Sequence, residues 1–102
     1  MNNYKKLSMD EIQKGLDLLP NWMIKKDKLY RNYEFSNFVQ AFGFMTQVAL
    51  VAERLDHHPE WSNVYKTVEI NLSTHAANGI TDFDFKLAVA IENVYSNFMV
   101  RN

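Results

Sequence analysis

The sequence of 102 residues contains no cysteine, only two prolines and three glycines, and no run of lysines or arginines. Without cysteine it forms no disulfide, no thiolate metal site and no cysteine nucleophile. A net charge of -1 at pH 7 argues against binding nucleic acid through its phosphates. Residues 1–6 are polar and lack the apolar segment of a signal peptide. We therefore expect a soluble, cytoplasmic protein that does not bind nucleic acid.

The sequence also lacks a hydrophobic run long enough for a membrane span. Its longest uncharged stretch covers residues 35–52, is interrupted by polar side chains and is shorter than a typical spanning helix. We interpret this stretch as a buried helix and expect no membrane contact. With 47% hydrophobic and 23% charged residues, the chain is typical of one globular domain over residues 1–102.

The N-terminal third predicts a helix followed by two strands. Ser8 stands three residues before Glu11, a capping box that predicts a helix start, and Pro20 predicts its end. The inner side of this helix would carry Ile12, Leu16 and Leu19. Residues 22–24 and 29–35 are expected to form strands joined at Lys26-Asp27, although that turn contains no glycine.

The uncharged stretch predicts a second helix that starts near Ser36 and is apolar on more than one face. Apolar residues at steps of four and three define an inward stripe of Phe38, Phe42, Met45, Ala49 and Ala52. Further apolar residues widen it: Val39, Phe44, Val48, Leu50, Val51 and Leu55. The first charges are Glu53 and Arg54, whereas a surface helix normally has a charged outer face.

Two explanations fit such a helix. It forms the centre of the monomer's own core, or a second copy of the chain covers it. We favour a homo-oligomer, with Phe44, Val48 and Val51 as the apolar patch that a monomer would leave exposed. A homotetramer built from two-fold dimers is the expected form.

The C-terminal half predicts two strands and a third helix. After Pro59 the apolar residues alternate, and one parity holds Val64, Val68, Ile70 and Leu72. In a regular strand His75 would have the opposite parity and point away from the apolar face. Asn78-Gly79 predicts a turn, and Thr81 to Asp84 form a second capping box. The helix that follows would turn inward Phe85, Ala88, Ile91, Tyr95 and Phe98.

This order of elements predicts an α+β fold. Its sequence of elements is αββαββα, in which three helices pack on one face of a four-stranded antiparallel sheet.

Three histidines, His57, His58 and His75, are the main candidates for chemistry. Histidine titrates near neutral pH and can donate and accept a proton within one cycle. Pro59 holds His58 in an extended backbone conformation. The alternatives are three unrelated surface histidines or a zinc site. The spacing does not favour zinc, because adjacent histidines point in different directions and no cysteine joins them.

Two carboxylates and two aromatic residues accompany the histidines. Glu53 lies four residues before His57 and would share its helix face if the helix continued that far. Asp84 has a structural role as the fourth residue of the capping box, with orientation of the site as a second effect. Trp61 and Tyr65 are able to stack on a flat heterocycle, or to serve as core or interface residues.

Together these residues resemble a family signature. The spacing Glu53-x3-His57-His58-Pro59-x5-Tyr65-x9-His75-x8-Asp84 is similar to that of the pterin-4a-carbinolamine dehydratases. In animals this family is also known as a dimerisation cofactor of a homeodomain transcription factor. The resemblance covers residues 8–98 and includes three near-identical stretches, at residues 41–45, 56–61 and 72–75.

The resemblance implies a dehydratase that eliminates water from 4a-hydroxytetrahydropterin to give quinonoid dihydropterin. The pterin would be the substrate, with no cofactor and no metal. The implied catalytic residues are His57 and His75 as acids on opposite faces of the ring and His58 as base and positioning group. The implied substrate-binding residues are Asp56, His57, His58, Ser73, Thr74, His75 and Ala76, and the supporting residues are Glu53, Trp61 and Asp84. The homotetramer is implied as well.

Two other functions are compatible with the sequence. One is a non-catalytic coactivator or dimerisation cofactor that binds a protein partner of unknown identity. The other is a pterin-sensing or assembly protein with a decayed site. The presence of all three histidines, together with Glu53 and Asp84, argues against decay.

Overall fold

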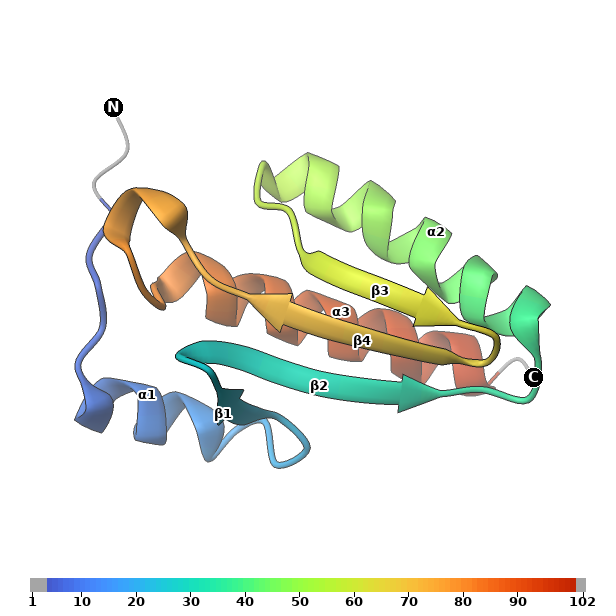
Figure 1. The fold of residues 1–102 in the computed structure, drawn as a ribbon, viewed down its shortest axis with the longest axis horizontal. Helices are drawn as coiled ribbons and strands as arrows, with labels where there is room; N and C mark the ends of the chain where they lie inside the picture. The colour runs from blue at the N-terminus through green and yellow to red at the C-terminus, as the bar shows by residue number, and fades with distance from the viewer. Residues whose placement is uncertain (1–3, 101–102) are drawn as a thin grey trace.

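The computed structural model describes residues 4–100 and has the predicted order of elements (Figure 1). Its helices are α1 (Met9–Leu16), α2 (Phe38–Leu55) and α3 (Asp82–Val100), with a single 3-10 turn at His75–Ala77. Its strands are β1 (Met23–Lys25), β2 (Lys28–Glu34), β3 (Glu60–Val64) and β4 (Thr67–Leu72). They form one antiparallel sheet in the order β1-β2-β4-β3, so the predicted α+β class is confirmed.

The start of α1 and the β1–β2 hairpin follow from local residue chemistry. The Ser8 hydroxyl accepts the Glu11 N–H, and the Glu11 carboxylate accepts the Ser8 N–H, so the predicted capping box forms. Lys26 and Asp27 both have positive φ, 52° and 64°, as a two-residue hairpin turn with right-handed strand twist requires. Aspartate tolerates this conformation better than most residues other than glycine.

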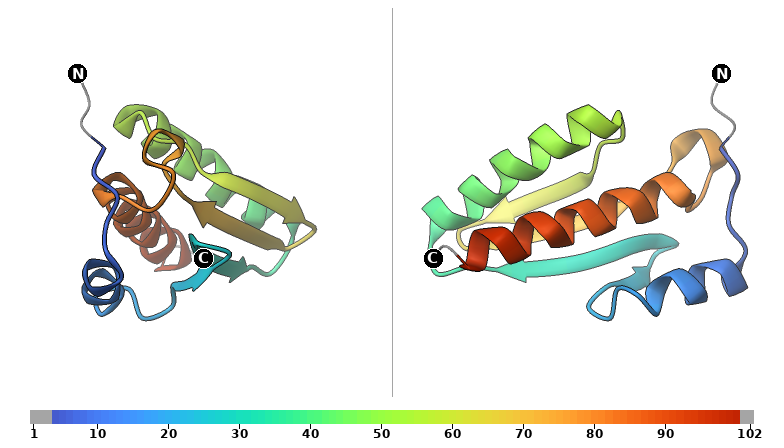
Figure 2. Two further views of the ribbon diagram at one scale, coloured as in Figure 1. Left: turned by 60° about the vertical axis from the view of Figure 1, so that its left-hand side comes forward. Right: turned by 180° about the vertical axis from the view of Figure 1, so that it is seen from behind.

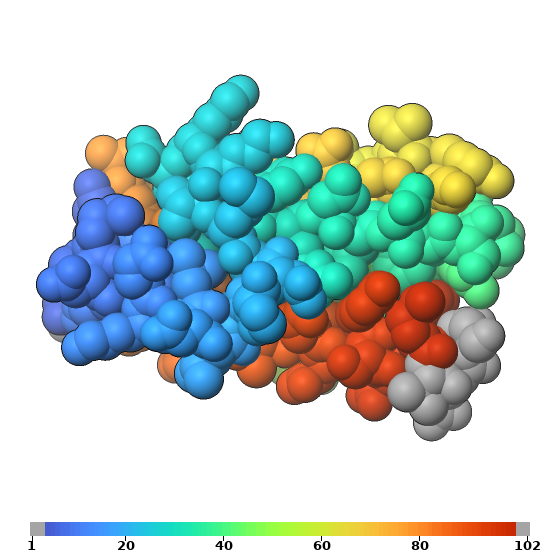
Figure 3. Space-filling model, turned by 90° about the horizontal axis from the view of Figure 1, so that it is seen from below, coloured from blue at the N-terminus to red at the C-terminus, as the bar shows by residue number. Residues whose placement is uncertain are grey.

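All three helices lie on one side of the sheet, as predicted (Figure 2). The strands turn alternate side chains toward them, and Val68, Ile70 and Leu72 of β4 are fully buried. On β2, Leu29 and Tyr33 are buried on the same face. Seen from below, β1 and β2 in cyan meet α1 in blue and α3 in orange-red without a gap (Figure 3).

One predicted core position on the sheet is wrong. Val64 was expected to share the apolar face of the strand, but it is 77% exposed. The reason is a hairpin turn that starts directly after it, where Tyr65 has a φ of 53°. Val64 pairs with Thr67, so it shares the face of the sheet that no helix covers.

The predicted inward stripe of α2 is also wrong in its phase. The buried residues are Ala41, Phe44, Val48 and Ala52. Of the predicted stripe, Phe38 and Phe42 are about half exposed and Ala49 is exposed. Periodicity did not fix the phase because apolar residues surround most of this helix. Contact with α3 and β4 fixes it instead.

Because α2 buries a different face from the predicted one, the expected exposed apolar patch is also wrong. Phe44 and Val48 lie in the chain's own core with no exposed surface, and Val51 is partly buried against it. The large apolar side chains that α2 exposes are Phe38, Val39, Phe42 and Leu50.

The other helices match their predicted inner faces more closely. In α3, Ala88 and Ile91 are fully buried, and the remaining predicted residues, Phe85, Tyr95 and Phe98, pack against the core while partly buried. In α1, Ile12 is buried; the helix ends at Leu16, so buried Leu19 lies in the turn before Pro20.

Candidate active site

The sheet brings the histidine segments together at one of its ends. β3 begins where antiparallel β4 finishes, with Glu60 opposite Asn71, and Leu29 near the start of β2 lies opposite Leu72. The residues just before β3 and just after β4 therefore lie at the same edge. His57 and His58 occupy the first of these segments and His75 the second, as the ribbon in Figure 1 shows for the two loops.

The end of α2 directs the first segment toward this edge. Asp56 has left-handed backbone angles, φ 53° and ψ 42°, and its N–H donates to the carbonyls of Ala52 and Glu53. The His57 N–H donates to the Ala52 carbonyl at 3.1 Å. This left-handed ending closes the helix and reverses the chain, a role that aspartate fills without glycine. His57 therefore leaves the helix and turns toward the start of α3.

Asp84, at the start of α3, contacts the ring of His57. Its side chain is fully buried, and its Oδ1 lies 2.6 Å from His57 Nε2. Its Oδ2 accepts the Thr81 N–H and the Thr74 hydroxyl, both at 2.9 Å. An ionised carboxylate only accepts hydrogen bonds, so His57 Nε2 carries a hydrogen and Nδ1 is left as the ring atom available for chemistry.

The predicted structural role of Asp84 is present, and its contact with His57 is the geometry that the predicted orientation of the site requires. The bond from the Thr81 N–H is the carboxylate half of a capping box, although the Thr81 hydroxyl accepts from Phe83 N–H at 3.2 Å and not from Asp84. Thr74, a predicted substrate-binding residue, is buried, and its hydroxyl also lies 2.8 Å from that of Thr81.

Glu53 pairs with a different histidine from the one that its spacing suggested. Glu53 Oε1 lies 2.9 Å from His58 Nε2, and both side chains are exposed. The expected face shared by Glu53 and His57 does not form, because α2 ends at Leu55 and Asp56 reverses the chain. The structure therefore gives two of the histidines a carboxylate partner each.

His75 lies on the other side of the site. β4 ends at Leu72, and His75 opens the 3-10 turn with an exposed side chain, so its direction comes from this turn and not from a regular strand. Ser73 is partly buried and Ala76 is exposed beside it. The predicted turn at Asn78-Gly79 is present: Asn78 has a φ of 53°, and Gly79 bridges back to Thr74.

The sequence analysis did not single out Glu60 and Lys28, which meet at the same edge. Lys28 Nζ lies 2.6 Å from Glu60 Oε1. The hydrogen bond and charge of Lys28, with a smaller contribution from His75, hold the pKa of Glu60 below its usual range. The signal for Glu60 was its place directly after Pro59 in the histidine segment. Lys28 had no local signal, because only the sheet register brings it there.

The two candidate stacking residues occupy different places. Trp61 lies opposite Ile70 on the helix side of the sheet and packs, partly buried, against the core. Tyr65 is in the β3–β4 turn, 61% exposed, at the end of β3 away from the histidines. The structure thus brings together the histidines, Asp84 and Glu53, but not Tyr65.

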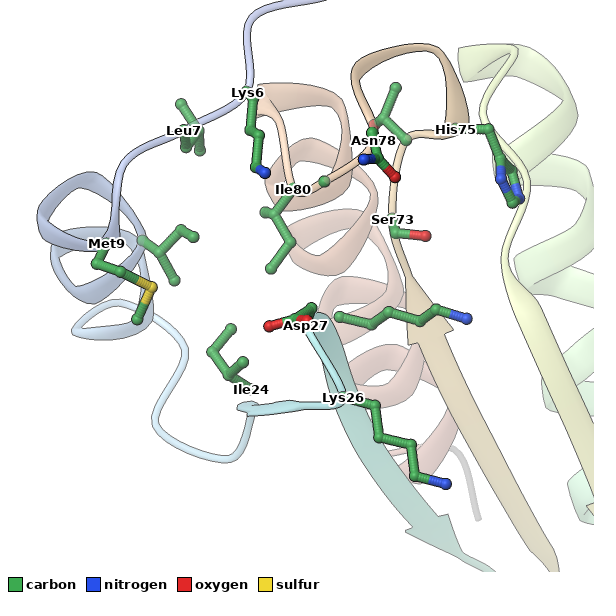
Figure 4. Close-up of a pocket in the computed structure, with 14 residues that line it drawn as sticks. Lys6, Leu7, Met9, Ile24, Lys26, Asp27, Ser73, His75, Asn78 and Ile80 are labelled. Carbon is green, nitrogen blue, oxygen red and sulfur yellow. The ribbon is translucent and has the colours of Figure 1, made fainter.

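A cleft of about 710 Å³ opens beside His75 (Figure 4). Ser73, Thr74 and His75 contribute to its lining, whereas His57 and His58 do not. It continues from the histidine edge toward α1 and the β1–β2 turn. Among residues 4–100 no group of three or more histidine, aspartate or glutamate side chains is arranged to hold a metal ion. None of the helices in this part of the chain is long and apolar enough to cross a membrane.

These features define what the site can do. Imidazoles with carboxylate partners exchange protons with a bound organic molecule, and the adjoining cleft has the size of a small-molecule site.

Comparisons with known proteins point to the same chemistry. Residues 5–94 match the family model described as pterin 4 alpha carbinolamine dehydratase. A relative named as such a dehydratase from Chelativorans sp. (strain BNC1) is 55% identical over 86 residues, 82% of this chain and 88% of its own. Another, from Rhizobium rhizogenes (strain K84), is 52% identical over 91 residues, covering 87% and 90%.

A solved structure gives the same result. The crystal structure of a transcriptional coactivator/pterin dehydratase from Brucella melitensis superposes with a TM-score of 0.85 at 40% identity. The superposition covers 88% of this chain and 98% of that one.

Proposed function

The chain belongs to the pterin-4a-carbinolamine dehydratase family and is a hydro-lyase, and from this premise we propose that His57, His58 and His75 carry out the reaction. The substrate is a tetrahydropterin with a hydroxyl group on carbon 4a. The C4a–O bond breaks, the hydroxyl leaves as water after gaining a proton, and N5 loses a proton. The product is quinonoid dihydropterin, and each turnover needs one acid and one base.

The observation that supports this assignment best is the contact of His57 with buried Asp84. The buried carboxylate fixes the ring through Nε2 and leaves Nδ1 for the substrate. In the proposed reaction the imidazole enters as the acid, with a hydrogen on Nδ1 that it donates to the leaving hydroxyl. After water has left, the neutral ring is recharged from solvent. His57 is therefore the first acid.

His58 and His75 complete the proposed proton transfers. His58, paired with Glu53, accepts the N5 proton and positions the ring. His75, on the segment after β4, acts as acid toward the opposite face of the pterin. The first acid and the base thus lie on the loop before β3 and the second acid on the loop after β4, so a flat substrate between the two loops would have an acid on each face.

The two loops also supply the proposed substrate contacts. Asp56, Ser73, Thr74 and Ala76 flank the histidines, and their polar groups and backbone suit the donors and acceptors along a pterin edge. Glu53, Trp61 and Asp84 support the site through His58, the core and His57 respectively. We propose that the reaction requires neither a metal nor a cofactor.

The direct test is dehydration of 4a-hydroxy-6-methyltetrahydropterin by purified protein. Single substitutions His57→Ala, His58→Ala and His75→Ala should each lower the enzymatic rate by about 100- to 10,000-fold. The uncatalysed reaction is subtracted, and circular dichroism checks the fold. A folded triple-alanine variant with full activity would exclude the histidine mechanism.

A coactivator role is the second candidate, because the relative from Brucella melitensis is named both coactivator and dehydratase. The same assay separates the two. A folded protein that binds a partner but does not accelerate dehydration would favour the non-catalytic function.

We also propose that the enzyme is a cytoplasmic homo-oligomer, with a homotetramer as the expected form, that serves pterin recycling. The exposed apolar residues Phe38, Val39, Phe42 and Leu50 on α2 support self-association.

A further inference from the structure

The cleft beside His75 extends well beyond the histidines. Figure 4 shows His75 at one end, Met9 and Leu7 at the other, and Ser73, Asn78 and Asp27 between them. Its volume of about 710 Å³ lies within the range of sites that enclose whole drug-sized ligands. A two-ring pterin held among the histidines would leave the part of the cleft near α1 unfilled.

The chemistry of the substrate indicates what would fill this part. In a pterin, only N5 separates carbon 6 from carbon 4a, so a substituent on carbon 6 leaves the ring next to the reacting atoms. Among the histidines, only His75 lines the cleft, so the cleft is the nearest enclosed space for that substituent.

The walls of the cleft combine apolar surface with cationic side chains. Ile12, Ile24 and Ile80 contribute apolar lining, and Lys6, Lys26 and Lys28 contribute lysine side chains. In Figure 4, Lys6 extends into the cleft, whereas Lys26 extends away from it. Lys28 already pairs with Glu60 at 2.6 Å. Lys6 makes no ion pair among residues 4–100, so its ammonium group is available to a ligand.

The fold positions Lys6 rather than leaving it free in solvent. The Leu7 N–H donates to the Ile80 carbonyl at 2.8 Å and ties the N-terminal segment to the edge of the cleft. The methylene groups of Lys6 lie over Gly79, where an added Cβ would come within 2.7 Å of Lys6 Cε. Glycine at this position therefore lets the lysine lie flat and point into the cleft, as Figure 4 shows.

We propose that this cleft binds the carbon-6 substituent of the reduced pterin and that Lys6 selects substituents carrying a carboxylate or a phosphate. The proposal rests on the dehydratase function and specifies its substrate class. The apolar inner wall fits a spacer between the ring and the charged group. Asp27, whose carboxylate also lines the cleft, opposes the anion and weakens its binding.

Binding of stable dihydropterins tests this without the reaction. Three probes are compared by titration calorimetry: neutral 6-hydroxymethyl-7,8-dihydropterin, its phosphate ester and 7,8-dihydropteroylglutamate. We expect both anionic probes to bind about tenfold more tightly than the neutral one at low salt, and the difference to shrink at high salt. Tighter binding of one anionic probe alone identifies phosphate or carboxylate as the group selected.

Variants that should lower the preference for anionic probes, and one that should raise it, distinguish selection by Lys6 from a general loss of structure. Lys6→Gln should remove most of the preference for anionic probes, about five- to tenfold, and Gly79→Ala should reduce it by displacing the lysine. Asp27→Asn should increase the preference, because it removes the opposing charge and asparagine tolerates the same backbone conformation. Lys14→Gln, an exposed site on α1 that does not line the cleft, is the matched control.

Equal affinity of wild type for all three probes would overturn the proposal. So would a preference that Lys6→Gln leaves intact, or one that Lys14→Gln lowers equally. Dehydration of 4a-hydroxy-6-methyltetrahydropterin by wild type is measured separately. Because this substrate has no charged substituent, its turnover tests the proposed function, and the probe comparison tests the cleft.

Discussion

At the scale of single residues, Asp84 connects fold and chemistry. One buried carboxylate accepts from the Thr81 backbone, the Thr74 hydroxyl and the His57 ring. The first bond starts α3 and the third fixes a histidine of the site. A single side chain therefore stabilises the helix and orients the proposed acid.

Asp84→Asn should impair both roles. An amide keeps one accepting oxygen but turns N–H donors toward groups that donate themselves, which costs about 1–3 kcal/mol of stability. We expect kcat/KM to fall by about 100-fold, with a changed pH–rate profile because His57 loses its fixed tautomer. Urea unfolding and steady-state kinetics measure the two effects.

The control for this prediction is a variant that is destabilised elsewhere. Gly15→Ala alters the contact between α1 and α3, away from the histidines. If it lowered kcat/KM and changed the pH profile as Asp84→Asn does, Asp84 would have no specific role in positioning His57.

A second carboxylate, the partly buried Glu92, connects separate elements through its hydrogen bonds. Its carboxylate accepts hydrogen bonds from Trp22, Arg31 and Tyr33. Burial works to raise the pKa of Glu92, but these hydrogen bonds outweigh it and hold the pKa below its usual range. The same burial and the bond to Glu92 raise the pKa of Tyr33 far above its usual range.

Glu92 should make the fold sensitive to acid. A carboxylate whose pKa is lowered by folding stabilises the protein above its unfolded pKa, about 4.3 for glutamate, and this contribution is lost as pH falls through the lower folded value. We expect Glu92→Gln to cost about 2 kcal/mol at pH 7 and less at pH 3, by urea unfolding. Glu34→Gln, which is exposed, is the control; an equal pH dependence in both variants would contradict this assignment.

At the scale of elements, close contact between helices depends on glycine in one place and not in another. A Cβ on Gly15 of α1 would lie 2.4 Å from Cε1 of Phe85 on α3. A Cβ on Gly43 of α2 would lie 3.4 Å from Phe98, an ordinary contact distance. Both glycines lie in helices, so alanine at either position gains in helix propensity, but only at Gly15 does the added Cβ clash with a neighbour.

The two alanine substitutions should therefore act in opposite directions. Gly15→Ala forces Phe85 to move and should destabilise the protein by about 1–3 kcal/mol. Gly43→Ala should stabilise it by up to about 1 kcal/mol, since alanine is the better helix former. Thermal unfolding of both variants measures the shifts. Stabilisation by both would show that helix propensity alone decides, and destabilisation by both would show that Gly43 is also too crowded for a Cβ.

At the scale of the whole molecule, one surface has an unusual composition. Phe38, Val39, Phe42 and Leu50 expose large apolar side chains along α2, whereas Ala41, Phe44, Val48 and Ala52 of the same helix are buried. Several such residues buried between copies, at about 1.5–3 kcal/mol each, would offset the cost of association. The original expectation of self-association thus applies to different residues from those first named.

Light scattering at micromolar concentration should give about four times the 12.0 kDa chain mass. Phe42→Glu combined with Leu50→Glu should lower the measured mass, because two charged side chains would enter the apolar contact between copies. Leu18→Glu changes a leucine outside α2 that is even more exposed than Leu50, and it should leave the mass unchanged. A single 12 kDa species for the wild type would exclude the oligomer.

The sequence by itself determined the order of elements, the helix starts and the alternation in β4. Ser8 and Glu11, Lys26 and Asp27, and the run from Val68 to Leu72 act through neighbours in the chain, so their spacing is sufficient information. The sequence also identified the three histidines and Asp84 as candidate site residues, because they occur in a specific motif.

Tertiary structure alone decided which groups meet. The phase of α2 depends on contacts with α3 and β4, since an almost wholly apolar helix carries no phase of its own. Glu53 contacts His58 instead of His57 because Asp56 reverses the chain, a change of direction that periodicity does not contain. The cleft beside His75 joins segments at positions 6–12, 24–28 and 73–80, and only the folded sheet brings these together.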